Sequence, residues 1–136
     1  MFPDDLTTEV LSASLRGLDA RNTALANNIA NAETPGYKRV DVSFESALAD
    51  AVESDRARLH RGSEGFMPAF SEQGRAIDSF DPSVGSVVTT TMRVDGSNVD
   101  PDNEMAQLSA NTLAHQTVVS LLDKRFAQFR TAIMGR

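Results

Sequence analysis

Residues 26–37 read Ala-Asn-Asn-Ile-Ala-Asn-Ala-Glu-Thr-Pro-Gly-Tyr, a cluster of asparagines followed by an abrupt turn. Residues 34–36 end a helix, because proline disfavours the α region for the preceding residue and Pro-Gly fits the centre of a type II turn. Asparagine is a poor helix former, since its amide competes for backbone hydrogen bonds. The three asparagines therefore predict either fraying or partners at the end of the helix.

Upstream of that turn, apolar residues recur with the alternating four- and three-residue spacing of a coiled-coil seam. The seam comprises Leu11, Leu15, Leu18, Asn22, Leu25, Ile29 and Ala32. This spacing predicts a helix of about 27 residues, roughly 40 Å long at 1.5 Å per residue. Asn22 is the polar exception, and it either fixes the register of an interface or lies partly exposed.

A second, longer helix is predicted over residues 101–134. Asp100 fits its cap, Pro101 its first position, and Asp102 its first turn. Its seam comprises Met105, Leu108, Thr112, His115, Val119, Leu122, Phe126, Phe129 and Ile133. Flanking apolar residues widen this stripe, which indicates contact with more than one neighbouring helix. We expect His115 to be a buried or interface residue rather than a pH switch.

The centre of the chain carries a weaker pattern. A short amphipathic helix is predicted from apolar residues four apart, at Phe44, Leu48 and Val52. The following stretch has four Gly and two Pro, which predicts a flexible, partly disordered loop. A Val- and Thr-rich run then turns at Asp95-Gly96 and predicts a short β-hairpin.

The fold class expected from these patterns is mainly α. Long N- and C-terminal helices pack as a coiled-coil layer, around a short β-hairpin and a loop-rich middle. The expected segments are a helix and turn in 1–38, a short helix in 39–53, a flexible region in 54–85, a hairpin in 86–100 and a helix in 101–136. The first and last of these would form one assembly domain.

Composition excludes several classes of function. The net charge of −6 argues against a nucleic-acid-binding surface. With no Cys, the chain has neither disulfides nor thiolate chemistry. We see no cleaved signal peptide and no apolar stretch long enough to span a bilayer. His60 and His115 lack partners set by spacing, and no metal-ligand or phosphate-loop motif is present, so we expect no cofactor, no metal and no enzymatic activity.

Residues 28–38, Asn-Ile-Ala-Asn-Ala-Glu-Thr-Pro-Gly-Tyr-Lys, resemble the signature shared by bacterial flagellar rod, hook and hook-associated proteins. The signature residues carried over are Asn28, Ile29, Asn31, Thr34, Pro35, Gly36 and Tyr37. Residues 93–100, followed by Glu104, Met105, Leu108 and Asn111, narrow the resemblance to the proximal rod subunits. His115 departs from the pattern, since an aromatic residue, usually Tyr, is common there.

This resemblance implies a structural subunit, exported through the flagellar type III apparatus without signal cleavage. It implies polymerisation through the terminal helices into the rod of the basal body, which crosses the periplasmic space. The implied partners are other copies of the chain, FlgC- and FlgF-type rod proteins, the adaptor FliE and the membrane ring, with no nucleic acid and no membrane insertion. Phe44 and Leu48 match the family's Phe-x-x-x-aliphatic export-gate motif, although any amphipathic helix can contain this pattern and simple packing is the favoured explanation.

The leading hypothesis is therefore a rod subunit that transmits torque through helix packing. Two alternatives remain at this point. One is another axial rod subunit of the FlgC type. The other is a soluble helical secretion chaperone or adaptor that forms a closed dimer.

Overall fold

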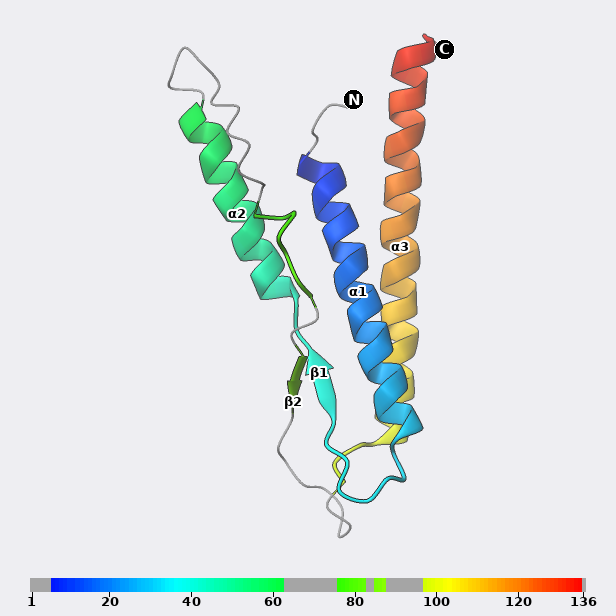
Figure 1. The fold of residues 1–136 in the computed structure, drawn as a ribbon. Helices are drawn as coiled ribbons and strands as arrows, with labels where there is room; N and C mark the ends of the chain where they lie inside the picture. The colour runs from blue at the N-terminus through cyan, green and yellow to red at the C-terminus, as the bar shows by residue number, and fades with distance from the viewer. Residues whose placement is uncertain (1–5, 63–75, 83–84, 88–96, 136) are drawn as a thin grey trace.

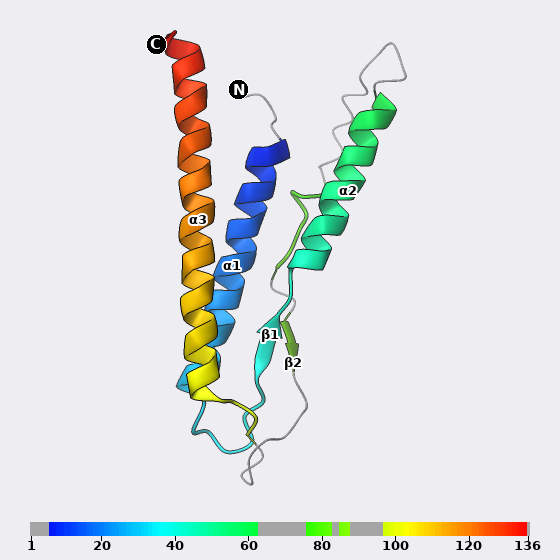
Figure 2. The same ribbon diagram turned by 180° about the vertical axis from the view of Figure 1, so that it is seen from behind.

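The computed structural model describes residues 6–62, 76–82, 85–87 and 97–135. Its elements, in chain order, are α1 (Leu6–Ala30), β1 (Val40–Val42), α2 (Glu45–Gly62), β2 (Gly85–Val87) and α3 (Pro101–Met134). The helices lie side by side with α1 in the middle (Figure 1; Figure 2, from behind). The mainly α class and the long terminal helices expected from the sequence are confirmed.

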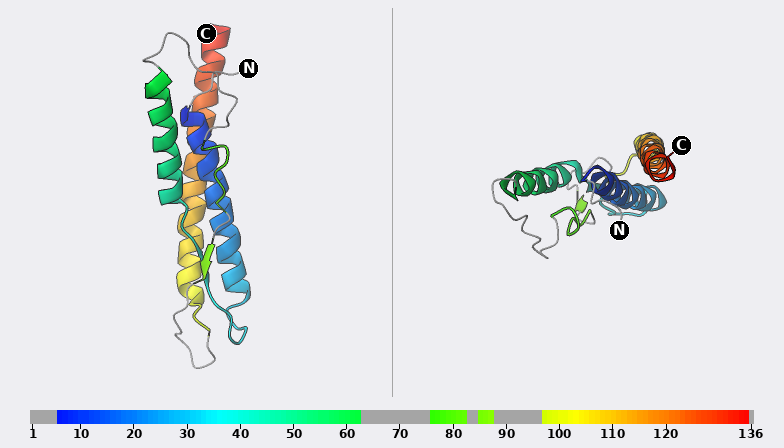
Figure 3. Two further views of the ribbon diagram at one scale, coloured as in Figure 1. Left: turned by 60° about the vertical axis from the view of Figure 1, so that its left-hand side comes forward. Right: turned by 90° about the horizontal axis from the view of Figure 1, so that it is seen from above.

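Helices α1 and α3 run antiparallel and make the most extensive contact between elements (Figure 3). α3 continues past the first residue of α1, as the upper part of Figure 1 shows. The Asn111 side chain contacts the Leu18 carbonyl. Leu6 lies twelve residues before Leu18 in α1. Because the helices are antiparallel with the same rise per residue, Leu6 lies opposite a position about twelve residues after Asn111, near residue 123. We call residues 126–134 the α3 overhang.

Both ends of α3 carry well-formed caps. The Asp100 side chain accepts a hydrogen bond of 3.2 Å from the backbone N–H of Asp102, and Pro101 occupies the first turn. Gly135 adopts φ +66° and donates its N–H to the Thr131 carbonyl at 2.9 Å. A side chain at such a left-handed position is strained, so this glycine suits the end of the helix.

The apolar core lies on the α2 side of α1. Ala13 and Ala24 of α1 meet Phe44 and Leu48, with Ile77 and Phe80 of the segment 76–82 closing the cluster. A Cβ at Gly17 would lie 2.3 Å from the Phe44 ring, so only glycine permits this approach. The Arg21 guanidinium covers the same ring, 4.8 Å from its centroid.

The strand pairing differs from the predicted hairpin within residues 86–100. β2 pairs antiparallel with β1, with Val87 opposite Val40. Residues 97–99, the expected return strand, form no strand and are buried instead. A tertiary contact holds residues 97–99 outside the sheet, because Asn98 Oδ1 accepts a hydrogen bond of 2.7 Å from the backbone N–H of Arg39. The Asp95-Gly96 turn lies outside the described residues.

The second helix is longer than predicted and runs into the expected loop region. α2 begins at Glu45 and ends at Gly62, so residues 54–62 are helical. Five of these nine residues are Arg, Ala or Leu, which are good helix formers, but the segment has almost no apolar periodicity from which a helix could be predicted. The Asp55 carboxylate also accepts the backbone N–H groups of Ala76 and Ile77, at 3.0 and 3.1 Å, and anchors the returning chain.

Candidate assembly site

The signature residue Asn28 is fully buried at the end of α1. Its Nδ2 donates to the Val40 carbonyl at 2.8 Å and to Glu104 Oε2 at 2.9 Å. Its Oδ1 accepts the Val40 N–H at 3.0 Å and the Tyr37 hydroxyl at 3.2 Å. The four hydrogen bonds use both donors and both lone pairs of one amide. Asn28 thus ties α1 to β1 and to the start of α3.

Glu104 completes this connection from α3 and is itself fully buried. Arg39 Nε lies 2.5 Å from Glu104 Oε1, and Arg39 Nη2 donates to Gln107 Oε1 at 2.9 Å. A buried carboxylate is costly unless a cation and hydrogen bonds satisfy it. Here Arg39 and Asn28 do so. We call Asn28, Tyr37, Arg39, Val40 and Glu104 the signature junction.

The rest of the signature shapes the turn that brings Tyr37 back to Asn28. Gly36 adopts φ +74°, which favours glycine. Tyr37 donates its N–H to the Thr34 carbonyl at 3.2 Å, and Asn31 Nδ2 donates to the Asn27 carbonyl at 2.8 Å. Ile29 is half-buried, whereas Thr34, Pro35 and Gly36 are exposed. The turn therefore positions the buried part of the signature and leaves its own tip in solvent.

The predicted seam of α1 lies mostly inside the molecule. Leu18 and Leu25 are buried, and Leu11 and Leu15 are half-buried. Asn22 is exposed, so it does not set register within the single chain.

The face of α3 that packs on α1 follows a different phase from the predicted seam. Its buried or half-buried residues are spaced four and three apart, at Glu104, Leu108, Asn111, His115, Val118, Leu122, Arg125 and Phe129. Leu108, His115, Leu122 and Phe129 belong to both sets. Three of the other inward positions, Glu104, Asn111 and Arg125, are polar, so a hydropathy pattern does not predict that they face α1.

The remaining predicted seam positions are exposed in the single chain. Met105 is 58%, Val119 37%, Phe126 51% and Ile133 74% exposed. With Thr112, they repeat every seven residues along one flank of α3, the period that packs a helix against another helix. We call these five residues the outer stripe. Leu113, Leu121 and Met134 add further exposed apolar surface.

His115 lies on the α1-facing side of α3, where its Nε2 is 3.3 Å from Asp19 Oδ1. The two side chains are 38% and 67% exposed, so water screens this pair. It joins the helices but adds little to their association.

The possible export-gate residues Phe44 and Leu48 are both core residues in the folded chain. Phe44 packs on Gly17 and under Arg21, and Leu48 is buried beside it. An export apparatus reaches these side chains only when this part of the chain is unfolded.

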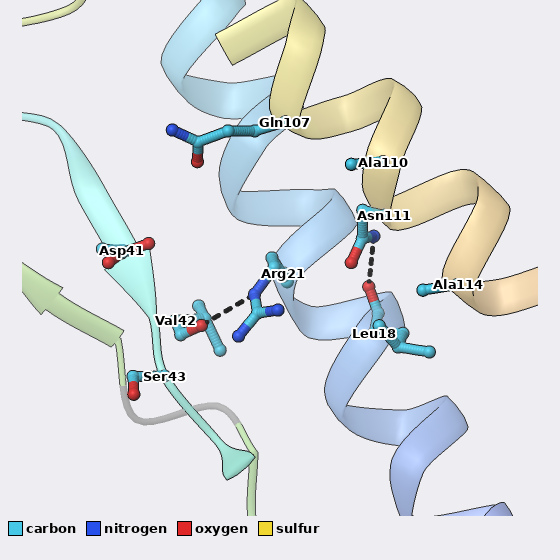
Figure 4. Close-up of a pocket in the computed structure, with 9 residues that line it drawn as sticks. All are labelled: Leu18, Arg21, Asp41, Val42, Ser43, Gln107, Ala110, Asn111 and Ala114. Atoms are coloured by element: carbon cyan, nitrogen blue, oxygen red, sulfur yellow. Dashed lines mark hydrogen bonds between the residues drawn. The ribbon is translucent and has the colours of Figure 1, made fainter. Parts of the chain in front are cut away.

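A groove of about 390 Å³ lies between α1, α3 and the strand β1 (Figure 4). Leu18, Ala110 and Ala114 supply apolar walls, and Asp41 and Asn111 bring polar groups. Asn111 Nδ2 donates to the Leu18 carbonyl at 2.9 Å.

Arg21 closes the end of the groove nearest α2. Its Nε donates to the Val42 carbonyl at 2.9 Å (Figure 4), and its Nη2 lies 2.7 Å from the Glu45 carboxylate. Burial raises the pKa of Glu45, but the hydrogen bond from Arg21, backbone N–H donors and the guanidinium charge outweigh it. The pKa of this carboxyl therefore lies below its usual value.

Sequence reasoning missed Arg21, Arg39 and Glu104 as organising residues. Glu104 carried two signals, since it is one of the residues that support the family resemblance and it precedes Leu108 by four residues, in phase with the inner face of α3. Arg21 and Arg39 carry no periodic signal, because their partners come from other elements.

Within the residues that the structure describes, no group of three or more acidic, His or Cys side chains is placed to hold a metal ion. In the same residues, no helix combines the length and apolar character needed to cross a membrane.

Comparison with known proteins points in one direction. The model of the family described as "Flagella basal body rod protein" matches residues 15–38. The flagellar basal body rod protein FlgB of Cereibacter sphaeroides is 32% identical, over 98% of this chain and 97% of its own length. FlgB of Bacillus subtilis is 29% identical over 95% and 94%. FlgB of Salmonella typhimurium is 30% identical over 85% and 83%.

Proposed function

Because this chain belongs to the FlgB family of flagellar basal body rod proteins, we propose that it builds the rod through the outer stripe of α3. The chain is a structural subunit of the bacterial flagellar rod. It belongs to the basal body and assembles there with other rod and basal-body proteins. The resemblance inferred from residues 28–38 and 93–100 is confirmed at the level of this family.

The observation that carries the proposal is the exposure of the outer stripe. Four large apolar side chains on one heptad line stand in water in the single chain. Burying one such side chain is worth about 1.5–3 kcal/mol, so a shared stripe supports a stable contact between subunits. Exposed apolar side chains aligned along one flank of a helix favour a role in a protein interface.

The signature junction complements the stripe in transmitting torque. A subunit transmits torque only if its two long helices, α1 and α3, do not move relative to each other. The buried Asn28–Glu104–Arg39 connection fixes the end of α1 against the start of α3. The signature residues thus hold the shape of the subunit, and the stripe joins one subunit to the next.

The finer role follows from the family and the sequence together. We assign as partners other copies of this chain, FlgC- and FlgF-type rod proteins, FliE and the membrane ring. We further assign export through the flagellar type III apparatus without a cleaved signal, a rod that crosses the periplasmic space, and no catalytic activity. Deletion of the gene tests this role, because loss of the rod from isolated basal bodies, restored by the wild-type gene, is the expected result.

Substitutions on the outer stripe test the mechanism. Val119→Glu and Phe126→Glu place charges on exposed positions, so the monomer should keep its helical signal and its melting temperature. Assembly should fall by tenfold or more, measured as basal bodies with complete rods per cell. Thr117→Glu, exposed on the far side of α3, is the matched control and should assemble normally. Normal assembly of both stripe variants would remove the stripe from the interface.

A helical chaperone that forms a closed dimer is the competing function. Sedimentation of the purified chain separates the two. A single dimer that does not grow with concentration, together with a motile deletion strain, favours the chaperone. A monomer that forms longer species as concentration rises favours the rod subunit.

A further inference from the structure

The groove beside α1 contains one buried acceptor without a partner among the described residues. Asn111 Oδ1 is buried and accepts no hydrogen bond from the described residues. A buried acceptor without a donor destabilises the folded chain, and a donor that enters the groove would recover this loss. In Figure 4 the Asn111 amide oxygen is directed into the space between α3, α1 and β1.

Asp41 provides a charge on the opposite wall of the same groove. Its side chain is 44% exposed and lies 3.5 Å from Arg39 Nη2, a long contact that leaves capacity for a second cation. Ala110 and Ala114 are exposed and one helical turn apart, so the α3 wall offers apolar surface with room for another helix. The groove therefore suits an apolar helix face with a cation at its centre.

The α3 overhang has this combination. Phe126, Arg130 and Ile133 are spaced four and three residues apart, so they share one face of the helix. All are exposed, and Arg130 forms no hydrogen bond or ion pair with the described residues. Its guanidinium has five N–H donors, enough for a carboxylate and an amide oxygen together.

We propose that this groove receives the α3 overhang of a second copy of the chain, with Arg130 of that copy between Asp41 and Asn111. The proposal rests on the rod function stated above and names the contact that extends it. The groove and the overhang are different surfaces of the subunit, so the overhang of one copy can enter the groove of a second copy while the overhang of the second enters the groove of a third. Passed on in this way, the contact is heterologous. Repetition of such a contact produces a ring or an open helical array.

Disulfide trapping tests this contact cleanly, because the chain has no Cys. Ala114→Cys combined with Ile133→Cys, oxidised in flagellated cells and in concentrated purified protein, should give linked dimers and longer species. Gln116→Cys with Ile133→Cys, at a similar height on the other flank of α3, is the control and should link at least fivefold less. Equal linkage in the control, linkage by Ala114→Cys alone, or no linkage in either preparation would overturn the proposal.

Charge exchange tests the central ion pair. Asp41→Arg and Arg130→Asp should each reduce assembly at least tenfold, and the double variant should recover to within about threefold of wild type. Ala114→Trp fills the groove from an exposed position and should also block assembly, with an unchanged melting temperature.

Failure of this proposal is distinguishable from failure of the proposed function. If these variants assemble as wild type does while the wild-type gene still restores the rod of a deletion strain, the groove contact is wrong and the rod role stands. If the wild-type gene is not needed for the rod, the proposed function itself fails.

Discussion

At the scale of single residues, Asn28 explains why an asparagine stands where helix propensity disfavours one. Its amide is a four-way connector among α1, β1, Tyr37 and Glu104. A carboxamide can both donate and accept, which neither an apolar residue nor a carboxylate does. The neighbouring Asn27 is exposed and supplies only its carbonyl to Asn31.

Asn28→Asp should therefore destabilise the folded chain by about 3 kcal/mol, since it removes a donor and places a second carboxylate against buried Glu104. Urea unfolding followed by circular dichroism measures the change. Asn27→Asp makes the same chemical change one residue away in solvent and should alter stability by less than about 0.5 kcal/mol. Equal losses in the two variants would contradict the role given to the junction.

Gly17 is the second position at which one residue decides local packing. Gly17→Ala improves helix propensity by up to about 1 kcal/mol, yet its Cβ would overlap the Phe44 ring. We expect a net loss of about 1–3 kcal/mol from overpacking. Combination with Phe44→Leu should cost less than the sum of the two single losses. Additive losses would show that ring and glycine do not interact.

At the scale of elements, α3 carries two overlapping heptad lines. One faces α1 and the other forms the outer stripe, and Leu108, His115, Leu122 and Phe129 lie between them on the shared edge. The outer stripe has the seven-residue repeat of a helix-packing surface. Among the described residues, α1 packs against the first line, and the outer stripe is exposed.

The join between α1 and α2 depends on Arg21 and Glu45, and this gives it a pH dependence. Because the folded-state pKa of Glu45 is lowered, the pair stabilises the chain above the ordinary pKa of 4.5 and this contribution is lost as pH falls through the lowered value. Wild type should melt slightly above Glu45→Gln at pH 6, and the two should converge near pH 3. Glu53→Gln, exposed on the same helix, is the control substitution. The same difference in melting temperature at both pH values would show that the Arg21–Glu45 pair does not cause it.

At the scale of the whole molecule, the subunit is well fixed at one end and incomplete at the other. The signature junction and the strands fasten the lower end in Figure 1, and the α3 overhang projects beyond α1 at the upper end. Stability gained from packing is therefore uneven along α3. The proposed contacts between subunits would add packing at this upper end.

Because Phe44 is buried in the core, a test of its role in export needs a control for lost packing. Phe44→Ala removes core packing as well as the motif, so its effect on secretion needs a matched core variant. Phe80→Ala is buried in the same cluster and outside the motif. If Phe44 and Leu48 are read by the export apparatus, Phe44→Ala should reduce secretion severalfold more than Phe80→Ala, measured on culture supernatants. Equal secretion would assign Phe44 to packing alone.

Local sequence patterns are enough to predict the long terminal helices, the cap at Asp100 and the turn at residues 34–36, because propensity, capping and proline geometry act within a few residues. The same local rules predicted Leu18, Leu25, Leu108 and Leu122 as packed positions. Residues 28–38 carry the family resemblance, but their sequence does not show that Asn28 joins α1 to β1 and α3.

Three features depend on contacts between distant parts of the chain. They are the flank of α3 that meets α1, the pairing of β2 with β1, and the buried junction of Asn28, Arg39 and Glu104. A hydropathy scale predicts that Glu and Asn lie on the surface, because it includes only the free-energy cost of removing the side chain from water. It does not include the hydrogen-bond partner that offsets this cost in the folded chain. That partner lies 76 residues away in the chain for Asn28 and Glu104, a distance that only the folded arrangement removes. Where polar partners meet across elements, the fold and not the local pattern chooses which face is inside.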